Sequence, residues 1–156
     1  MAKKKNSSII ADNRRARHEY AFDESLECGI ELKGTEVKSV KSNKFSFSDA
    51  YARIRDHELW LIGLHVTPYI FGNIHNHDPD RDRKLLAHKQ EIKRLKRKVD
   101  EKGYTLIPLN FHLKDGKVKV QIGLGKGKRA YDKRETIKRR DQSREAEREI
   151  RSRMKY

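Results

Sequence analysis

The C-terminal segment of this chain contains so few apolar residues that it limits where a folded core can lie. The run Val118–Ile122 alternates like a strand and passes into Gly123, Gly125 and Gly127, with lysines between and beside the glycines. Between residues 130 and 155 the large apolar or aromatic side chains are Tyr131, Ile137, Ile150 and Met154. Burial of so few groups cannot offset the conformational entropy lost on ordering. The core is therefore expected before residue 130, and the free tail is expected to be disordered.

The net charge of the chain indicates a polyanionic partner. Charged residues make up 39% of the 156 residues, against about 25% in typical globular chains, and the formal net charge is +15. Nucleic acid and an anionic membrane surface are the two candidates. The longest apolar run, Leu59–Leu64, is far shorter than the roughly 20 residues that span a bilayer, so no membrane anchor is expected.

Cysteine usage favours a reducing compartment. Cys28 is the one cysteine, so no internal disulfide can form, and its side chain is expected to pack in the core. Residues 1–8 are polar and basic with no apolar segment behind them, so we expect a disordered lead-in and no secretory signal. A cytoplasmic monomer is expected.

The first half of the chain is predicted to be mostly strands. Residues 9–20 are interpreted as a solvated edge strand, and Arg17–Phe22 alternates as a strand does. Residues 23–30 have apolar positions at helical spacing, which predicts a short helix. Further strands are predicted over 31–40, 45–55 and 58–67, with Trp60 in the core.

The second half of the chain contains the clearest helical pattern. Leu85, Leu86, Ile92, Leu95 and Val99 fall on one face of a predicted helix that ends at Gly103. A hairpin follows, with strands over 104–113 and 117–124 across an Asp-Gly turn. The preceding loop, 71–84, contains His75, His77 and Asp78, whose spacing matches no zinc framework, so neither a metal nor a cofactor is expected.

These elements predict a mainly β fold with α. About six short strands and two or three helices fit a small OB-like closed antiparallel β-barrel, because closure removes exposed strand edges. An open α+β sheet is the alternative. The predicted organisation is a disordered basic N-terminus over 1–8, an OB-like RNA-binding barrel over 9–129 and a basic tail over 130–156.

Several side chains have the chemistry of RNA contacts. Between residues 13 and 20, Arg14 and Arg17 can reach phosphates, and the rings of His18 and Tyr20 can stack on bases. Lysines among the glycines near residue 126 let ammonium and backbone N–H groups approach phosphates. In the tail, Ala146, Ile150 and Met154 form a thin apolar line at helical spacing, which is typical of a segment that becomes helical against RNA.

Four sequence blocks resemble the SsrA-binding protein (SmpB) family. They are NRRARHEY at 13–20, GIELKGTEVKSV at 29–40, DPDRDRKLL at 78–86 and GKGKRAYDKRE at 125–135. The blocks occur in the family's order over nearly the whole chain, and the last block is the most specific.

The resemblance implies a non-enzymatic protein with an OB-like barrel that binds the tRNA-like domain of transfer-messenger RNA (tmRNA, or SsrA RNA). It implies that the protein delivers this RNA to bacterial ribosomes stalled without a stop codon, in trans-translation. It also implies that the tail enters the small-subunit decoding centre and the empty mRNA channel as a helix.

Carried over by position, the resemblance implies RNA contacts by Asn13, Arg14, His18, Tyr20, Glu27, Lys84, Leu86, His88, Lys126, Gly127 and Lys128. Arg17 joins this set on its charge and position. The resemblance implies ribosome contacts by Asp132, Lys133, Arg134, Lys138, Arg139, Ile150 and Met154. Tyr131 stands where many members have histidine; either ring can stack on a base, so Tyr131 is included.

Two other classes of protein remain open. A ribosomal protein or an OB-type RNA chaperone without tmRNA specificity has the same composition. An RNA-acting enzyme would need an acid–base pair or a metal cluster, and the scattered histidines form no such constellation in the sequence.

Overall fold

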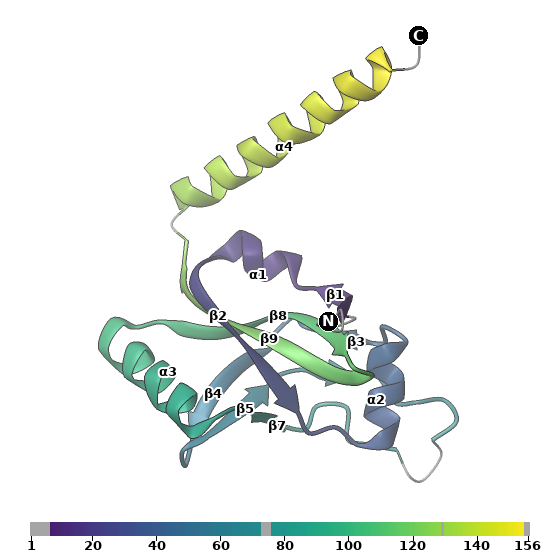
Figure 1. Ribbon diagram of the computed structural model, residues 1–156, viewed down its shortest axis with the longest axis vertical. Coiled ribbons are helices and arrows are strands. Elements are labelled where there is room, and N and C mark those ends of the chain that lie inside the picture. Colours follow the sequence, from purple (N-terminus) through teal and green to yellow (C-terminus); the bar gives the residue numbers. More distant parts are fainter. Residues whose placement is uncertain (1–6, 73–75, 129, 155–156) are drawn as a thin grey trace, which may run out of the picture.

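The computed structural model describes residues 7–72, 76–128 and 130–154, excluding the side chains of residues 7, 102, 130–133, 135 and 136. Within these ranges the strands are β1 (Ser7–Asp12), β2 (Tyr20–Ile30), β3 (Phe45–Ser46), β4 (Tyr51–Arg55), β5 (Glu58–Ile62), β6 (His65–Val66), β7 (Arg83–Leu86), β8 (Thr105–Lys114) and β9 (Lys117–Gly127). The helices are α1 (Arg14–Glu19), α2 (Gly34–Lys41), α3 (Lys89–Lys102) and α4 (Ala130–Arg153). The body is a mixed α/β structure, and α4 leads away from it (Figure 1).

Seven of these strands form one large antiparallel sheet in the order β1-β8-β4-β5-β7-β2-β9, and β9 pairs with β8 as well. The long strand β8 makes this arrangement possible: its Leu106 end pairs with β4, and residues 110–114 pair with β1. Its other edge pairs with β9 from Thr105 to Lys114. The short strands β3 and β6 form a separate two-stranded sheet.

The hydrophobic core is formed mainly by buried side chains of this sheet together with Ile92 and Leu95 of α3. On β5, Leu59 and Leu61 are fully buried, so the alternation of a strand turns Trp60 to the outer side. The prediction of Trp60 in the core is therefore wrong; its ring is half-buried with the Arg55 guanidinium 5.0 Å from its centroid. Cys28 is buried in the core, as predicted.

Three of the N-terminal predictions are wrong because distant partners decide the local structure. Residues 14–19 form α1 rather than a strand, because Asn13 caps the helix. Residues 23–30 belong to β2 rather than a helix, since β2 pairs with β9 along most of its length. Residues 34–41 form α2 rather than a strand, with the carboxylate of Glu36 accepting a hydrogen bond from the backbone N–H of Lys33.

The middle of the chain also differs from the prediction. Gly63, at φ +77°, divides the predicted strand over 58–67 into β5 and β6. Leu85 and Leu86 lie in β7, not in the helix, because β7 completes the sheet between β5 and β2. Gly103 ends α3 in the left-handed conformation and the β8–β9 hairpin turns at residues 115–116, so both of those predictions are confirmed.

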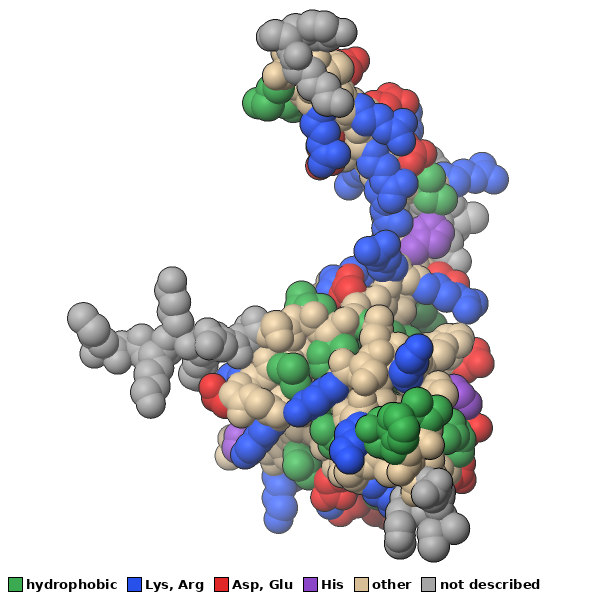
Figure 2. Space-filling model, turned by 90° about the vertical axis from the view of Figure 1, so that its right-hand side faces the viewer, with side chains coloured by type: hydrophobic (Ala, Val, Ile, Leu, Met, Phe, Trp, Pro, Cys, Tyr) green, Lys and Arg blue, Asp and Glu red, His purple; other side chains and the backbone are tan. Residues whose placement is uncertain are grey.

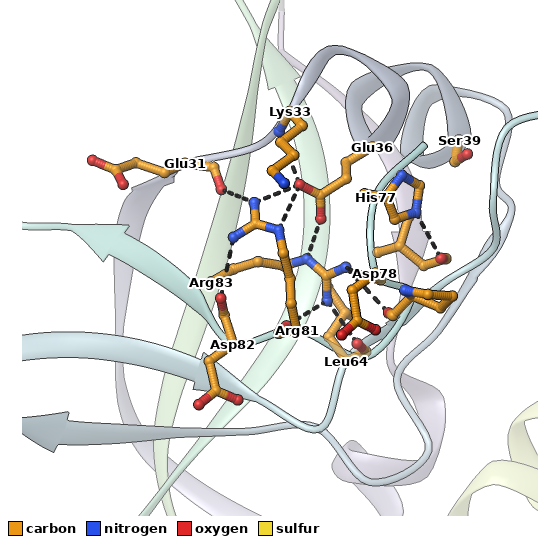
Figure 3. Close-up of polar contacts among 12 residues, drawn as sticks. Glu31, Lys33, Glu36, Ser39, Leu64, His77, Asp78, Arg81, Asp82 and Arg83 are labelled. Carbon is orange, nitrogen blue, oxygen red and sulfur yellow. Dashed lines mark hydrogen bonds and ion pairs between the residues drawn. The ribbon is translucent and has the colours of Figure 1, made fainter. Parts of the chain in front are cut away.

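A buried charge network links α2 to the segment before β7 (Figure 3). Glu36 and Arg83 are both fully buried, and the Arg83 Nε donates to Glu36 Oε2. Arg81 donates from Nε to Glu36 Oε1 over 2.9 Å. The remaining Arg83 nitrogens donate to main-chain carbonyls, including that of Leu64 at 2.7 Å. The network therefore fastens the 63–82 connection to α2.

The same hydrogen bonds determine how Glu36 titrates. Burial alone would raise its pKa, but donation from Arg81, from the Lys33 backbone N–H and from Arg83 outweighs burial and holds the pKa below its ordinary value of 4.5. A lowered pKa in the folded state stabilises the protein above the unfolded-state pKa. This contribution is lost as the pH falls through the folded-state pKa.

We predict that Glu36→Gln lowers the free energy of unfolding at neutral pH by about 3–5 kcal/mol, because the buried Arg83 guanidinium and the partly buried Arg81 guanidinium lose their counter-charge. Urea unfolding measures the change. The difference from the native protein should narrow as the pH falls below about 4.5, because the carboxylate is then protonated in the unfolded chain while it stays ionised in the folded protein down to its lower folded-state pKa. Glu19→Gln, which breaks an exposed pair with Arg15, is the control and should cost less than about 1 kcal/mol. A difference that stays constant down to about pH 3 would contradict a charged Glu36.

Candidate nucleic-acid interface

The sheet distributes the predicted RNA-binding residues of the body between the two ends of β2. At its beginning, Tyr20 pairs with Gly127 and Ala21 with Lys126. Near its end, Gly29 pairs with Leu86 of β7. Gly29 lies nine residue steps beyond Tyr20, which is about 30 Å along an extended strand. The predicted residues therefore form two groups rather than one continuous site.

In the first group, α1 presents basic side chains from a firmly attached base. Asn13 is buried and its side-chain Oδ1 accepts from the Ala16 backbone N–H at 3.2 Å, while its Nδ2 donates to the Pro108 carbonyl at 2.9 Å. The Asn13 backbone N–H donates to the Leu109 carbonyl at 2.7 Å. Both ends of the side-chain amide are thus occupied, and Asn13 orients α1 against β8.

The charged side chains of α1 differ in their freedom to meet a ligand. Arg14 is exposed and forms no ion pair with any described residue. Arg17 pairs with Asp12 through its Nε at 3.2 Å. His18 is half-buried, and the Tyr20 ring lies 6.1 Å from that of Phe22. A phosphate that binds Arg17 would have to compete with Asp12, whereas Arg14 is available at once.

The end of β9 completes the first group. Lys126 is exposed, and its Nζ lies 4.7 Å from the centroid of the Tyr104 ring. The backbone N–H of Lys128 donates to the Glu19 carbonyl at 2.8 Å, and its Nζ donates to the Arg17 carbonyl at 3.2 Å. These bonds hold the last residues of β9 beside α1.

The strand that contains the three glycines before Lys128 extends beyond its predicted end at residue 124. Gly123, Gly125 and Gly127 lie within β9. A Cβ on Gly123 or Gly125 would lie 2.6 or 2.7 Å from the Phe22 ring, so these two glycines make room for that ring. Of these three glycines, only Gly127 has open space where a Cβ would lie. Close approach of a phosphate to the backbone is therefore restricted to the end of the strand.

The second group lies where β7 joins α3. Lys84 donates to Glu58 at 2.9 Å, and this hydrogen bond raises the pKa of Lys84. Leu86 is 48% exposed although it is apolar, and His88 is exposed at the N-cap of α3 without a side-chain capping bond. An exposed apolar side chain and an exposed imidazole thus lie two residues apart at the surface.

Glu27 shares the outer face of β2 with Gly29, because side chains alternate along a strand and Cys28 is buried. Its carboxylate accepts from Lys114 at 2.9 Å and faces His112 Nε2 at 3.1 Å. Hydrogen bonding from Lys114, and then from His112, lowers its pKa. Glu27 therefore holds the Lys114 ammonium group and the His112 ring in place and offers no positive charge to phosphate.

The predicted tail residues lie along α4. Arg134, Lys138 and Arg139 are exposed, as are the apolar side chains of Ile150 and Met154. The side chains of Tyr131, Asp132 and Lys133 lie outside the described residues. Helix α4 begins beside α1, and Figure 2 shows basic side chains along much of its length. The tail thus starts at the first group and carries its charge away from the body.

The sequence prediction missed residues that line a hollow between α1 and β4. This hollow has a volume of about 340 Å³; Arg15 and Tyr51, which were not predicted, line it together with the predicted Tyr20. The signal was present in β4, where buried Ala52 alternates with exposed Tyr51, Arg53 and Arg55. An aromatic ring and arginines on one outer face are typical of a nucleic-acid surface.

Cys28 and His77 belong to residue types that often act in catalysis, but here both are buried within the fold. Burial raises the pKa of the Cys28 thiol to about 12, which leaves essentially no thiolate at neutral pH. His77 is buried between the Thr35 hydroxyl and the Val66 carbonyl, each at 2.9 Å. His75 lies outside the described residues. Among the residues described, no group of three or more potential ligands could hold a metal ion, and no helix is long and apolar enough to cross a membrane.

Comparison with known proteins gives consistent matches over nearly the whole chain. A family model described as SmpB protein matches residues 10–152. An SsrA-binding protein of Treponema denticola is 54% identical over 147 residues, which are 94% of this chain and 96% of the relative. An SsrA-binding protein of Clostridium botulinum is 49% identical over 156 residues, and the match covers 100% of both chains.

A solved structure is also similar to this chain. It is described as "tmRNA-SmpB: a journey to the center of the bacterial ribosome" and matches with a TM-score of 0.65 at 50% sequence identity. The match covers 77% of this chain and 85% of that chain.

Variants of Asn13 and of its neighbour Arg14 should affect different properties, namely stability for Asn13 and RNA binding for Arg14. We predict that Asn13→Ala lowers the free energy of unfolding by about 1–3 kcal/mol, because it removes a helix cap and leaves a buried carbonyl without its donor. Arg14→Ala should change stability by less than about 0.5 kcal/mol and weaken binding to an RNA oligonucleotide. Urea unfolding and fluorescence anisotropy measure the two properties. Equal stability of the two variants would contradict the role given to Asn13.

Proposed function

The chain belongs to the SmpB protein family, and on that premise we propose that it binds the tRNA-like domain of tmRNA and delivers this RNA to stalled bacterial ribosomes in trans-translation. The observation that carries the proposal is sequence similarity: SsrA-binding proteins align with nearly the whole chain, and about half of the aligned residues are identical. The solved tmRNA–SmpB structure supports the same partners, tmRNA and the ribosome. A site of action on the ribosome implies a cytoplasmic protein.

We infer that the body is an OB-like barrel that presents RNA-binding residues on its outside. In the order β8, β4, β5, β7, β2 and β9, each strand pairs with the next, and β9 returns to β8. A ring of pairings of this kind supports a closed barrel. Residues 9–129 would then be the RNA-binding domain, and residues 130–156 a tail that is disordered when free and helical on the ribosome.

The two groups of residues are proposed to contact tmRNA in different ways. In the first group Arg14, Arg17, Lys126 and Lys128 would neutralise phosphates, with His18 and Tyr20 stacking on bases and Gly127 allowing close approach. In the second, Leu86 and His88 would meet a base or sugar, while Glu27 holds Lys114 in place. Lys84 would release the Glu58 carboxylate and bind a phosphate in its place. Asn13 would contribute by orienting α1.

The tail is proposed to contact the small ribosomal subunit. Tyr131, Asp132, Lys133 and Arg134 would reach the decoding centre, where a ring at position 131 could stack on a base. The remaining contacts, by Lys138, Arg139, Ile150 and Met154, would follow the empty mRNA channel. The excess of arginine and lysine on α4 suits a channel lined with phosphates.

The proposed protein is a binding protein and not an enzyme. This part of the proposal is supported by the buried, protonated Cys28 and by histidines such as His77, whose ring nitrogens both face protein groups. A general RNA-binding protein without tmRNA specificity is the second candidate, because the composition and charge suit it equally. RNA preference distinguishes the two.

We predict that the full-length protein prefers the tRNA-like domain of tmRNA to an elongator tRNA across a salt series. Lys126→Ala with Lys128→Ala should weaken binding to the tRNA-like domain and reduce the slope of log K against log salt by about one unit for each phosphate that is no longer neutralised. Lys96→Ala with Arg97→Ala on α3 removes the same charge elsewhere and is the control. Equal affinity for both RNAs at every salt concentration would favour the general RNA binder.

Truncation after Ala130 should separate the two proposed partners. The shortened protein should bind the tRNA-like domain nearly as well as the full chain, since the first and second groups are intact. It should fail to support tagging of a nascent peptide on a ribosome stalled at the end of a message. A failure of the truncated protein to bind RNA would instead place the tail within the primary tmRNA site.

A further inference from the structure

The connection between β6 and β7 presents large apolar side chains to solvent. Ile70 is 82% exposed and Phe71 is 74% exposed. Figure 2 shows hydrophobic side chains gathered on the face of the body that includes this connection. Apolar groups that are displayed together in this way usually mark an interaction site.

The tip that carries these side chains is attached by polar contacts to the body. The Asn76 side chain accepts from the Tyr69 backbone N–H at 2.9 Å and donates to the Tyr69 carbonyl at 2.6 Å. The Gly72 N–H donates to the same carbonyl at 2.9 Å. Behind the tip, His77 is held by Thr35 and Val66, and the buried Arg83 donates to main-chain carbonyls of the same connection. These hydrogen bonds therefore hold the loop in a conformation that keeps its tip exposed.

Helix α2 places Lys38 beside the tip, and Lys41 follows about one turn later on the same side of the helix. The Lys38 Nζ lies 5.1 Å from the centroid of the Tyr69 ring, and this ring contacts Phe71 edge-on at 5.5 Å. Lys38, Lys41 and Lys44 are all exposed, and none forms an ion pair within the described ranges. The nearby carboxylate of Glu36 is buried and fully engaged by Arg81 and Arg83. The surface therefore combines aromatic rings with unneutralised positive charge.

We propose that this surface, composed of Tyr69, Ile70, Phe71, Lys38 and Lys41, is an additional RNA-binding site that takes a single-stranded segment. An unpaired base stacks on Phe71, Ile70 packs against the same base or the next one, and the two lysines bind the flanking phosphates. RNA accounts for both halves of the surface, because every base offers a π-face and every nucleotide adds a negative charge.

The position of this surface separates it from the first group. Helix α2 and the tip lie at the end of the body remote from the start of α4 (Figure 1). An RNA bound near Lys126 therefore leaves the tip accessible to another strand. The inference goes beyond the proposed function and needs no particular RNA to be the partner of the first group.

The test uses the full-length chain and a single-stranded RNA of about 12 nucleotides that contains 4-thiouridine. Irradiation should cross-link this RNA to the peptide that contains residues 69–72. The yield at that peptide as a function of RNA concentration measures the affinity of this surface separately from the rest of the protein. Phe71→Leu should weaken it about fivefold or more, because the ring is removed, whereas Phe71→Tyr should stay within about twofold.

Further variants test the remaining parts of the surface. Lys38→Ala with Lys41→Ala should reduce the cross-link and flatten its salt dependence by about one unit for each phosphate that the lysines neutralise. Ile9→Ser, which changes an exposed apolar residue on β1, should leave the cross-link unchanged and is the matched control. Thermal unfolding should be the same for all variants, since the changed side chains are exposed.

Two results would overturn the proposal. One is the absence of a cross-link at the tip peptide while other peptides are labelled. The other is a Phe71→Leu variant that cross-links as well as the native protein, which would mean that apolar surface and not the aromatic ring is needed, as for a protein or lipid partner. Failure of tmRNA recognition would affect neither readout, so the two proposals can fail separately.

Discussion

The buried carboxylate of Glu36 and its two arginines are the constraint on which the rest of the body depends. Charges removed from water are tolerated only when every donor and acceptor finds a partner, and here the arginines bind both the carboxylate and several main-chain carbonyls. One helix, a long irregular connection and strand β7 are thereby joined at a single point. β7 can then pair with β5 and β2, which completes the sheet. A purely apolar contact would bury the same area but would not orient an irregular connection so specifically.

The sheet in turn determines how charge is arranged over the surface. Strand β2 carries one group of candidate residues at each end, and each group also draws on a neighbouring helix. Cations near acidic side chains, such as Arg17 beside Asp12 and Lys84 beside Glu58, are held in place before a ligand arrives. Others, such as Arg14, have no such partner among the described residues. A surface of this kind combines preorganised contacts with contacts whose full charge is available to a polyanion.

Local chemistry explains which parts of the fold could be predicted from the sequence. The β8–β9 hairpin and the end of α3 were predicted because Asp115, Gly116 and Gly103 determine the turn and the helix stop by themselves. The predictions for residues 14–19, 23–30 and 34–41 failed because partners far along the chain decide them, namely Pro108, strand β9 and the two arginines. The family resemblance supplied candidate residues, but not their division into two groups, which depends on strand register. It also gave no indication that Gly123 and Gly125 accommodate Phe22.

The direct passage of β9 into the tail has a mechanical consequence. Up to Gly125, β9 is bonded to β2 on one side and to β8 on the other; Lys126 and Gly127 continue the pairing with β2, and Lys128 adds a backbone bond to Glu19. Hydrogen bonds between antiparallel strands lie perpendicular to the strand axis. A pull on the tail along that axis therefore loads many bonds in shear at the same moment, instead of opening them one after another. The body can withstand traction on its tail that would peel apart a hairpin pulled from its open end.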